Sequence, residues 1–210
     1  MKKIKLLALV LVLIIGYSCK ETKKEKEEQV KEIASEKFTL VKDSTKVSFT
    51  AYKTTEKLPV GGKFMKIDIK DPKSGATALD ALNGTNFSIP VSSLFTNDAT
   101  GTRDPKLLEF FFGVLKNTEL ISGVFKKDAN NKCSIDVTLN GETANIPLDY
   151  TLNSEKSITF NGTMNLEDWN ALEAITSINK ACKELHTGED GISKTWSDVA
   201  VQAQVQMNIN

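Results

Sequence analysis

The sequence is poor in the residues that most catalytic and metal sites need. It holds one histidine in 210 residues, His186, and three cysteines. Serine–histidine–aspartate catalysis and multi-histidine metal sites are therefore confined to that position or absent. No P-loop, dinucleotide-binding fingerprint, nucleophile elbow or zinc-ligand spacing occurs. The sequence predicts a protein that is not an enzyme and that carries no metal or cofactor of its own.

An excess of either charge is also missing. Lysine and arginine number 27, as do aspartate and glutamate, so the formal net charge is zero. Proteins that bind nucleic acids normally show a basic excess, and we therefore expect no nucleic-acid partner. Hydrophobic residues make up 40% of the chain, which is enough for the core of one packed domain.

The apolar run at the N-terminus is too short to cross a bilayer. It covers ten residues, Leu6 to Ile15, whereas a membrane-spanning helix needs about 20. Three lysines, Lys2, Lys3 and Lys5, precede it. A basic start followed by a short apolar run is typical of a secretory signal.

The end of this segment resembles a bacterial lipobox. It reads Ile-Gly-Tyr-Ser-Cys, and the last of these residues is Cys19. We therefore predict a lipoprotein signal peptide over residues 1–18, lipidation of Cys19, and a protein held by its lipid anchor to a membrane of the cell envelope. The alternative is an ordinary signal peptide with a chance cysteine. Removal of residues 1–18 leaves 24 basic and 27 acidic residues, a net charge of −3.

The stretch after Cys19 is highly charged. Residues 20–37 contain six lysines and six glutamates, and only Val30, Ile33 and Ala34 are apolar. Such a composition buries too little surface to fold alone. We interpret residues 19–37 as a flexible tether between the anchor and a folded domain over residues 38–210.

From Phe38 onward, apolar residues alternate with polar ones, the pattern of strands with one buried face. Asn140-Gly141 lies between two such runs and is a strong hairpin signal. The alternating apolar sets are Val47/Phe49/Ala51, Met65/Ile67/Ile69, Phe87/Ile89/Val91, Ile135/Val137/Leu139, Ile146/Leu148/Tyr150/Leu152, Ile158/Phe160/Met164 and Val199 to Ile209.

We therefore predict a mainly β fold, an antiparallel, lipocalin-like closed barrel of about eight strands. A β-sandwich is the alternative. Two segments depart from the alternation. Residues 104–115 predict a short, Phe-rich helix with Asp104 as its N-cap. Residues 166–187 carry apolar side chains every three or four positions and predict a longer amphipathic helix before the last strand.

The chain resembles the YceI-like proteins, bacterial periplasmic binders of polyisoprenoid lipids. Three stretches carry the resemblance: residues 38–69, with Ser48, Phe49, Gly62 and Phe64; the central SLFTNDATGTRDPKLLEFFF; and the hairpin VTLNGETANIPLDYTL. The resemblance implies a barrel whose apolar interior holds a long-chain lipid of polyisoprenoid or quinone type. A ligand-free scaffold for envelope interactions or stress responses is one alternative function, and a binder of a small ligand or haem, with His186 as an axial ligand, is another.

Eight aromatic residues are the candidates for lining such an interior, and each is equally well explained as ordinary core. They are Phe49, Phe64, Phe87, Phe111, Phe112, Phe125, Tyr150 and Phe160.

The remaining candidates are polar or sulfur-containing. Arg103 and Asp104 either position a lipid head group or cap a helix and bridge to a loop. His186 and Cys182 are four residues apart on one helix face, but a metal needs more ligands. Cys133 and Cys182 form a disulfide or remain two buried thiols, and the residues alone favour neither.

Overall fold

The computed structural model describes residues 37–210. The predicted signal peptide, Cys19 and all but the last residue of the predicted tether lie outside this range. Lys37, expected to end the tether, exchanges two backbone hydrogen bonds with Asn210 (2.9 and 3.0 Å), which places it in the fold.

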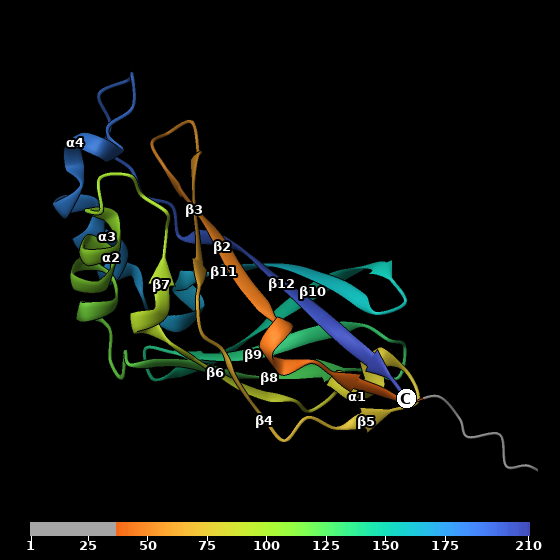
Figure 1. The fold of residues 1–210 in the computed structure, drawn as a ribbon. Coiled ribbons are helices and arrows are strands. Elements are labelled where there is room, and N and C mark those ends of the chain that lie inside the picture. Colours follow the sequence, from red (N-terminus) through yellow and green to blue (C-terminus); the bar gives the residue numbers. More distant parts are fainter. Residues whose placement is uncertain (1–36) are drawn as a thin grey trace, which may run out of the picture. The chain divides into compact units, whose positions relative to one another are not determined.

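Residues 37–210 form twelve strands joined in one antiparallel sheet (Figure 1). The strands are β1 (Phe38–Leu40), β2 (Lys46–Lys53), β3 (Leu58–Phe64), β4 (Asp68–Lys70), β5 (Ser74–Gly75), β6 (Asn86–Pro90), β7 (Leu94–Phe95), β8 (Leu120–Lys127), β9 (Cys133–Leu139), β10 (Glu142–Ser154), β11 (Ser157–Asn165) and β12 (Asp198–Ile209). Ten of them follow the order β4-β6-β8-β9-β10-β11-β12-β2-β3-β7, and β1 pairs with β12 and β5 at the side.

The sheet curls into a half-barrel and is not the closed barrel of about eight strands that the sequence suggested. Within residues 37–210 the two end strands, β4 and β7, do not pair with each other. The reason lies at Met65–Ile67, which the alternation placed inside one strand. The chain leaves β3 there, the Met65 amide bonds to the Ser93 carbonyl (2.8 Å), and β4 joins the opposite edge. The two edges are thus connected by the chain, not by a hydrogen-bonded ladder.

The hairpin predicted at Asn140-Gly141 is present. Both residues have positive φ, 55° and 79°, and Leu139 pairs directly with Glu142 across the turn. Two consecutive residues with positive φ match the right-handed twist of the flanking strands. The long β9–β10 hairpin therefore keeps its register, and Val137, Leu139 and Ile146 all face the interior.

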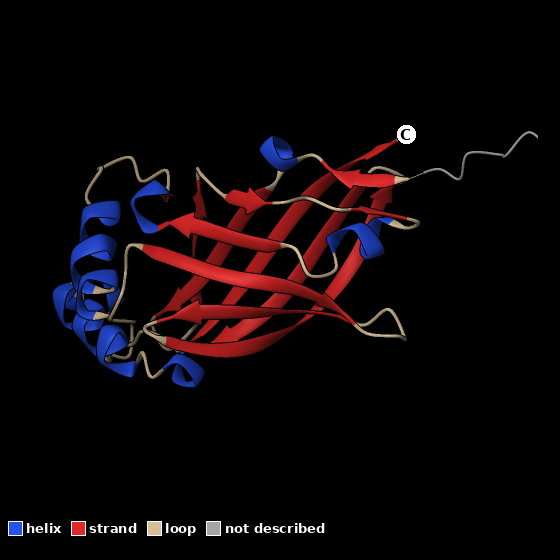
Figure 2. Ribbon diagram, turned by 90° about the horizontal axis from the view of Figure 1, so that it is seen from below, coloured by secondary structure: helices blue, strands red, loops and turns tan. Residues whose placement is uncertain are grey.

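Most of the helices lie at one end of the sheet (Figures 1 and 2). The α-helices are α1 (Ala78–Leu82), α2 (Arg103–Phe110), α3 (Leu172–Ala181) and α4 (Lys183–His186); the 3-10 turns are η1 (Lys42–Ser44), η2 (Val91–Ser93), η3 (Phe112–Val114) and η4 (Leu166–Trp169). Helices α2, α3 and α4 gather at the start of β12, whereas α1 lies at the other end, beside β1 and β5. No helix within residues 37–210 has both the length and the apolar character needed to span a bilayer.

The single amphipathic helix expected over residues 166–187 is divided into η4, α3 and α4. Asn170 ends η4 in the left-handed region, with φ of 53°, and Asn is one of the few residues that adopt it readily. The break rotates the apolar stripe. Trp169 is fully buried, but Leu172 and Leu185, expected on the buried face, are 47% and 59% exposed.

Buried side chains form two clusters along the half-barrel. The first lies toward β1 and α1 and includes Leu40, Leu82, Phe125 and Met207. The second lies toward the helical end; its central residue is Trp169, whose indole N–H donates to the Val137 carbonyl (2.8 Å). Residues of both clusters also line an internal cavity.

Candidate functional site

An apolar cavity of about 660 Å³ runs inside the half-barrel. Its wall can be followed along β12, where Val199, Val201, Ala203 and Val205 all face it. It begins at the helical end beside Trp196 and reaches Leu40, which pairs with Met207. At about 3.3 Å per residue and the usual strand tilt of a barrel, its length is roughly 25–30 Å. The sheet therefore encloses a narrow tube.

Seven of the eight aromatic candidates line this tube. They are Phe49, Phe64, Phe87, Phe111, Phe112, Phe125 and Phe160. The exception is Tyr150, which is 38% exposed and lies beside Phe160, its cross-strand partner, with 6.0 Å between ring centroids. Tyr150 shares its strand parity with Ile146 and Leu148, but it lies farther along β10, in the exposed part of that strand, and does not line the cavity.

Two of the rings lie across glycines on the neighbouring strand. Phe49 pairs with Gly62 and Phe87 pairs with Gly123. A Cβ atom added to Gly62 would come within 2.3 Å of the Phe49 ring, and one added to Gly123 within 2.6 Å of the Phe87 ring. Only glycine leaves room for a ring to lie against the backbone. These pairs keep the rings close to the wall and leave the centre of the tube open.

The Phe-rich segment lines the cavity at the helical end. Phe111 and Phe112 meet edge to face, with ring centroids 5.0 Å apart, and both line the cavity. Adjacent positions on a helix point about 100° apart, yet both rings face inward because α2 ends at Phe110 and the backbone turns into η3. Helix α2 packs on α3, which contributes Ile175 and Ile178 to the same end of the cavity.

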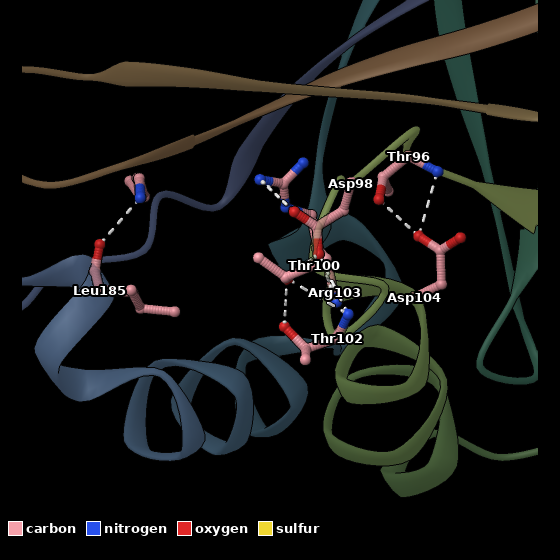
Figure 3. A network of polar contacts seen from close by, with 8 residues as sticks. Thr96, Asp98, Thr100, Thr102, Arg103, Asp104 and Leu185 are labelled. Carbon is pink, nitrogen blue, oxygen red and sulfur yellow. Dashed lines mark hydrogen bonds and ion pairs between the residues drawn. The ribbon is translucent and has the colours of Figure 1, made fainter.

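A polar network fixes the loop before α2 (Figure 3). Asp104, expected to cap the helix, instead accepts hydrogen bonds from the amide and hydroxyl of Thr96 (3.0 and 2.5 Å). Asp98 takes over the capping role and accepts from the amides of Thr102 and Arg103 (3.1 and 3.2 Å). A hydrogen bond from Thr100 lowers the pKa of Asp98, and the backbone amides at the helix start add to this effect.

Arg103 lines the mouth of the cavity and forms an ion pair with Asp98 (3.5 Å). Arg103 and Asp104 thus both bridge to the loop that precedes α2.

His186 lies at the same mouth. Its Nδ1 is 2.7 Å from the Thr195 hydroxyl, and the residue lines the cavity together with Lys53 and Lys106. Burial lowers the pKa of His186 to about 4, and the positive charges of Lys53 and Lys106 act in the same direction. The imidazole is therefore neutral at pH 7. Lys53 itself donates to the Leu185 carbonyl (2.9 Å), which fastens α4 to the end of β2.

The two cysteines within the described residues, Cys133 and Cys182, are free and buried. Cys133 starts β9 and packs in the cluster near β1, whereas Cys182 directly follows α3 and lines the cavity at the helical end. They lie in different parts of the fold, and two buried thiols is the alternative that the structure shows. Burial raises the pKa of the Cys133 thiol. Within residues 37–210, no three His, Cys, Asp or Glu side chains come together as a metal site requires.

Reasoning from the sequence did not select Lys53, Lys106, Thr195 or Trp196. No motif marks them: Lys53 ends β2, Lys106 lies within α2, and Thr195 and Trp196 precede β12. Trp196 donates from its indole to the Thr54 carbonyl (2.7 Å), and Lys57 and Lys194 lie over its ring, 4.3 and 3.4 Å from the centroid. These contacts join the β2–β3 turn to the segment before β12.

Solved structures with the same fold are known. A polyisoprenoid binding domain from Saccharophagus degradans superposes with a TM-score of 0.57 at 12% sequence identity, over 82% of this chain and 98% of that one. A mutant YCEI protein of Campylobacter jejuni gives a TM-score of 0.50 at 19% identity, over 72% and 85% of the two chains. No curated protein sequence matches the chain. The sequence itself matches the YceI-like domain over residues 38–210, and the chain therefore belongs to the YceI-like family.

Proposed function

We propose that this protein binds a lipid with a long apolar tail, of polyisoprenoid or quinone type, and that the tail lies inside the tube. The cavity carries this proposal. It is lined mainly by aliphatic and aromatic side chains, and polar groups gather at the mouth around Arg103 and His186. The similar structure from Saccharophagus degradans is described as a polyisoprenoid binding domain, which agrees with this proposal.

The dimensions suit one chain. A volume of about 660 Å³ falls within the usual range of ligand pockets, about 300–1,000 Å³. Spread over a length of roughly 25–30 Å, this volume gives a mean cross-sectional area of roughly 25 Å², about that of a single hydrocarbon chain. Each methylene moved from water into such a tube gains about 0.8 kcal/mol, so the tail supplies most of the affinity.

A series of prenyl alcohols tests the proposal. Geraniol, farnesol and geranylgeraniol have 10, 15 and 20 carbon atoms in total, and their dissociation constants can be measured by titration calorimetry. At about 0.8 kcal/mol per carbon, we expect a gain in affinity of up to about a thousandfold with each five-carbon unit until the tail fills the tube. No measurable binding at any length, together with a native mass spectrum of the extracted protein free of lipid, would contradict the proposal and favour a ligand-free scaffold for envelope interactions.

We also propose that the protein is a binding protein, not an enzyme, and that lipid on Cys19 anchors it to an envelope membrane, with the charged segment up to residue 36 as tether. Stable anchoring needs two or more acyl chains, which lipoprotein processing supplies. Cys19→Ala protein should leave the membrane fraction of fractionated cells, and Cys133→Ala protein should stay in it. A Cys19→Ala protein that remains with the membranes would show that another segment holds it there.

A further inference from the structure

The tautomer of the one histidine is fixed by its neighbours. The orientation of the Asn179 amide on α3 determines it. The amide nitrogen of Asn179 donates to the Ser193 carbonyl (3.4 Å), because a carbonyl oxygen can only accept. The amide oxygen of Asn179 then faces the hydroxyls of Thr195 and Ser193 (2.9 and 3.3 Å), and both must donate.

The Thr195 hydroxyl has one proton, and the bond to Asn179 uses it. Thr195 can therefore only accept from His186, and the imidazole must donate through Nδ1–H at 2.7 Å. A neutral imidazole protonated at Nδ1 carries a lone pair at Nε2. The contacts of Asn179 on α3 and Thr195 before β12 thus leave Nε2 of His186, on α4, as a hydrogen-bond acceptor.

This acceptor is accessible, and it belongs to a residue that lines the cavity. Within residues 37–210, the imidazole makes one hydrogen bond, the contact of Nδ1 with Thr195. Nε2 makes none among these residues, and it is absent from the set of fully buried polar atoms without a partner, so it is accessible. His186 belongs to the cavity wall at its mouth. Burial and the charges of Lys53 and Lys106 keep the ring from taking up a second proton.

We propose that Nε2 of His186 selects the head group of the bound lipid by accepting a hydrogen bond from its hydroxyl. This inference rests on the proposed lipid-binding function and narrows the ligand to a prenyl alcohol, phenol or quinol. A quinone, ether or ester offers no proton, and its bound head group leaves Nε2 without a partner away from water. Arg103 and Lys106 at the same mouth donate hydrogen bonds and suit a second, accepting oxygen of the head group.

Farnesol and farnesyl methyl ether form the probe pair, because they share one tail and differ in the hydroxyl proton. We expect the wild-type protein at pH 7.5 to bind farnesol about tenfold more tightly than the ether. His186→Phe, which keeps a ring of similar size, should bind the two within a factor of two. Thr195→Val keeps the side-chain shape but no longer fixes the tautomer of His186. Its preference for farnesol over the ether should lie between those of the wild type and His186→Phe.

The outcomes separate the two proposals. Equal binding of both probes by the wild-type protein, or an unchanged preference in folded His186→Phe and Thr195→Val, overturns the role of His186 and leaves the lipid-binding function in place. Binding of neither probe removes the function itself. If His186→Phe does not fold, the preference ratio of Thr195→Val decides. A ferric haem spectrum that the wild-type protein forms and His186→Phe loses would also overturn the inference, because Nε2 would then be a metal ligand.

Discussion

A single ring placed in the middle of the tube should block it. Ala203 on β12 faces the cavity, and its partners across the sheet are Phe160 and Val47. A phenyl ring needs on the order of 100–150 Å³ of apolar space, which is roughly a fifth of the cavity. The Ala203→Phe ring therefore spans the narrow bore without removing any existing contact, and we expect the domain to stay folded.

The size of the effect follows from the tail that is displaced. Between Ala203 and Leu40 the tube continues for roughly 10 Å, which holds at least about five carbons of a tail. At about 0.8 kcal/mol each, their loss costs about 4 kcal/mol, or close to a thousandfold in the Kd of geranylgeraniol. Geraniol is too short to reach Ala203, and its Kd should change by less than threefold.

The same exchange on the opposite face of the strand is the control. Ala200 lies three residues earlier on β12, so it points to the other side of the sheet, and it does not line the cavity. Ala200→Phe should bind geranylgeraniol as the wild type does. The reasoning fails if Ala203→Phe binds geranylgeraniol normally, or if both variants lose binding to the same degree. Thermal melts of the two variants would reveal overpacking, which typically costs 1–3 kcal/mol.

Three further outcomes follow from the packing at the helical end. Ile178→Asp places an unpaired charge on a buried side of α3 and should lower the free energy of unfolding by several kcal/mol, whereas the exposed Leu172→Asp should change it by less than about 0.5 kcal/mol; equal effects in urea titrations would contradict the observed break in the helix. Trp169→Phe leaves the Val137 carbonyl without its indole donor and should cost about 1–3 kcal/mol by the same measurement, and a change near zero would mean that the bond contributes nothing. His186 has a folded-state pKa lowered to about 4, so the unfolded chain binds the proton more readily; the contribution to stability is complete above about pH 6.5 and declines as the pH falls toward 4, and His186→Phe should lack this part of the pH dependence in melts across that range.

Much of the sheet could be predicted because the alternation of apolar and polar residues along a strand shows which of its faces is buried. The period-two runs around Phe49, Val137 and Val201 are strands with those side chains inside, and Asn140-Gly141 is a hairpin turn. These features depend on neighbours within a few residues along the chain. The break at Met65 does not, since it arises where the chain must leave one edge of the sheet and join the other.

The candidate site likewise has features that the sequence predicts and features that depend on tertiary contacts. Phenylalanine content and spacing marked seven residues that line the tube, because an apolar side chain on a strand faces the interior whether that interior is solid or hollow. Whether a central space remains was decided by pairings between distant strands, such as Phe87 with Gly123, which hold rings against the wall. Tyr150 has the correct parity but lies in the exposed part of β10, and this exposure depends on how the strands pack in three dimensions.

The sequence by itself determined the β fold, the inward-facing aromatic residues and the two helical interruptions, because alternation and helical spacing are local consequences of backbone geometry. Only the tertiary structure decided that the sheet curls without closing its ladder, that the helices cover one end, and that His186 meets Thr195 and Asn179 there. Those contacts join elements that are separate in the chain, and their geometry is set by how the packed elements meet.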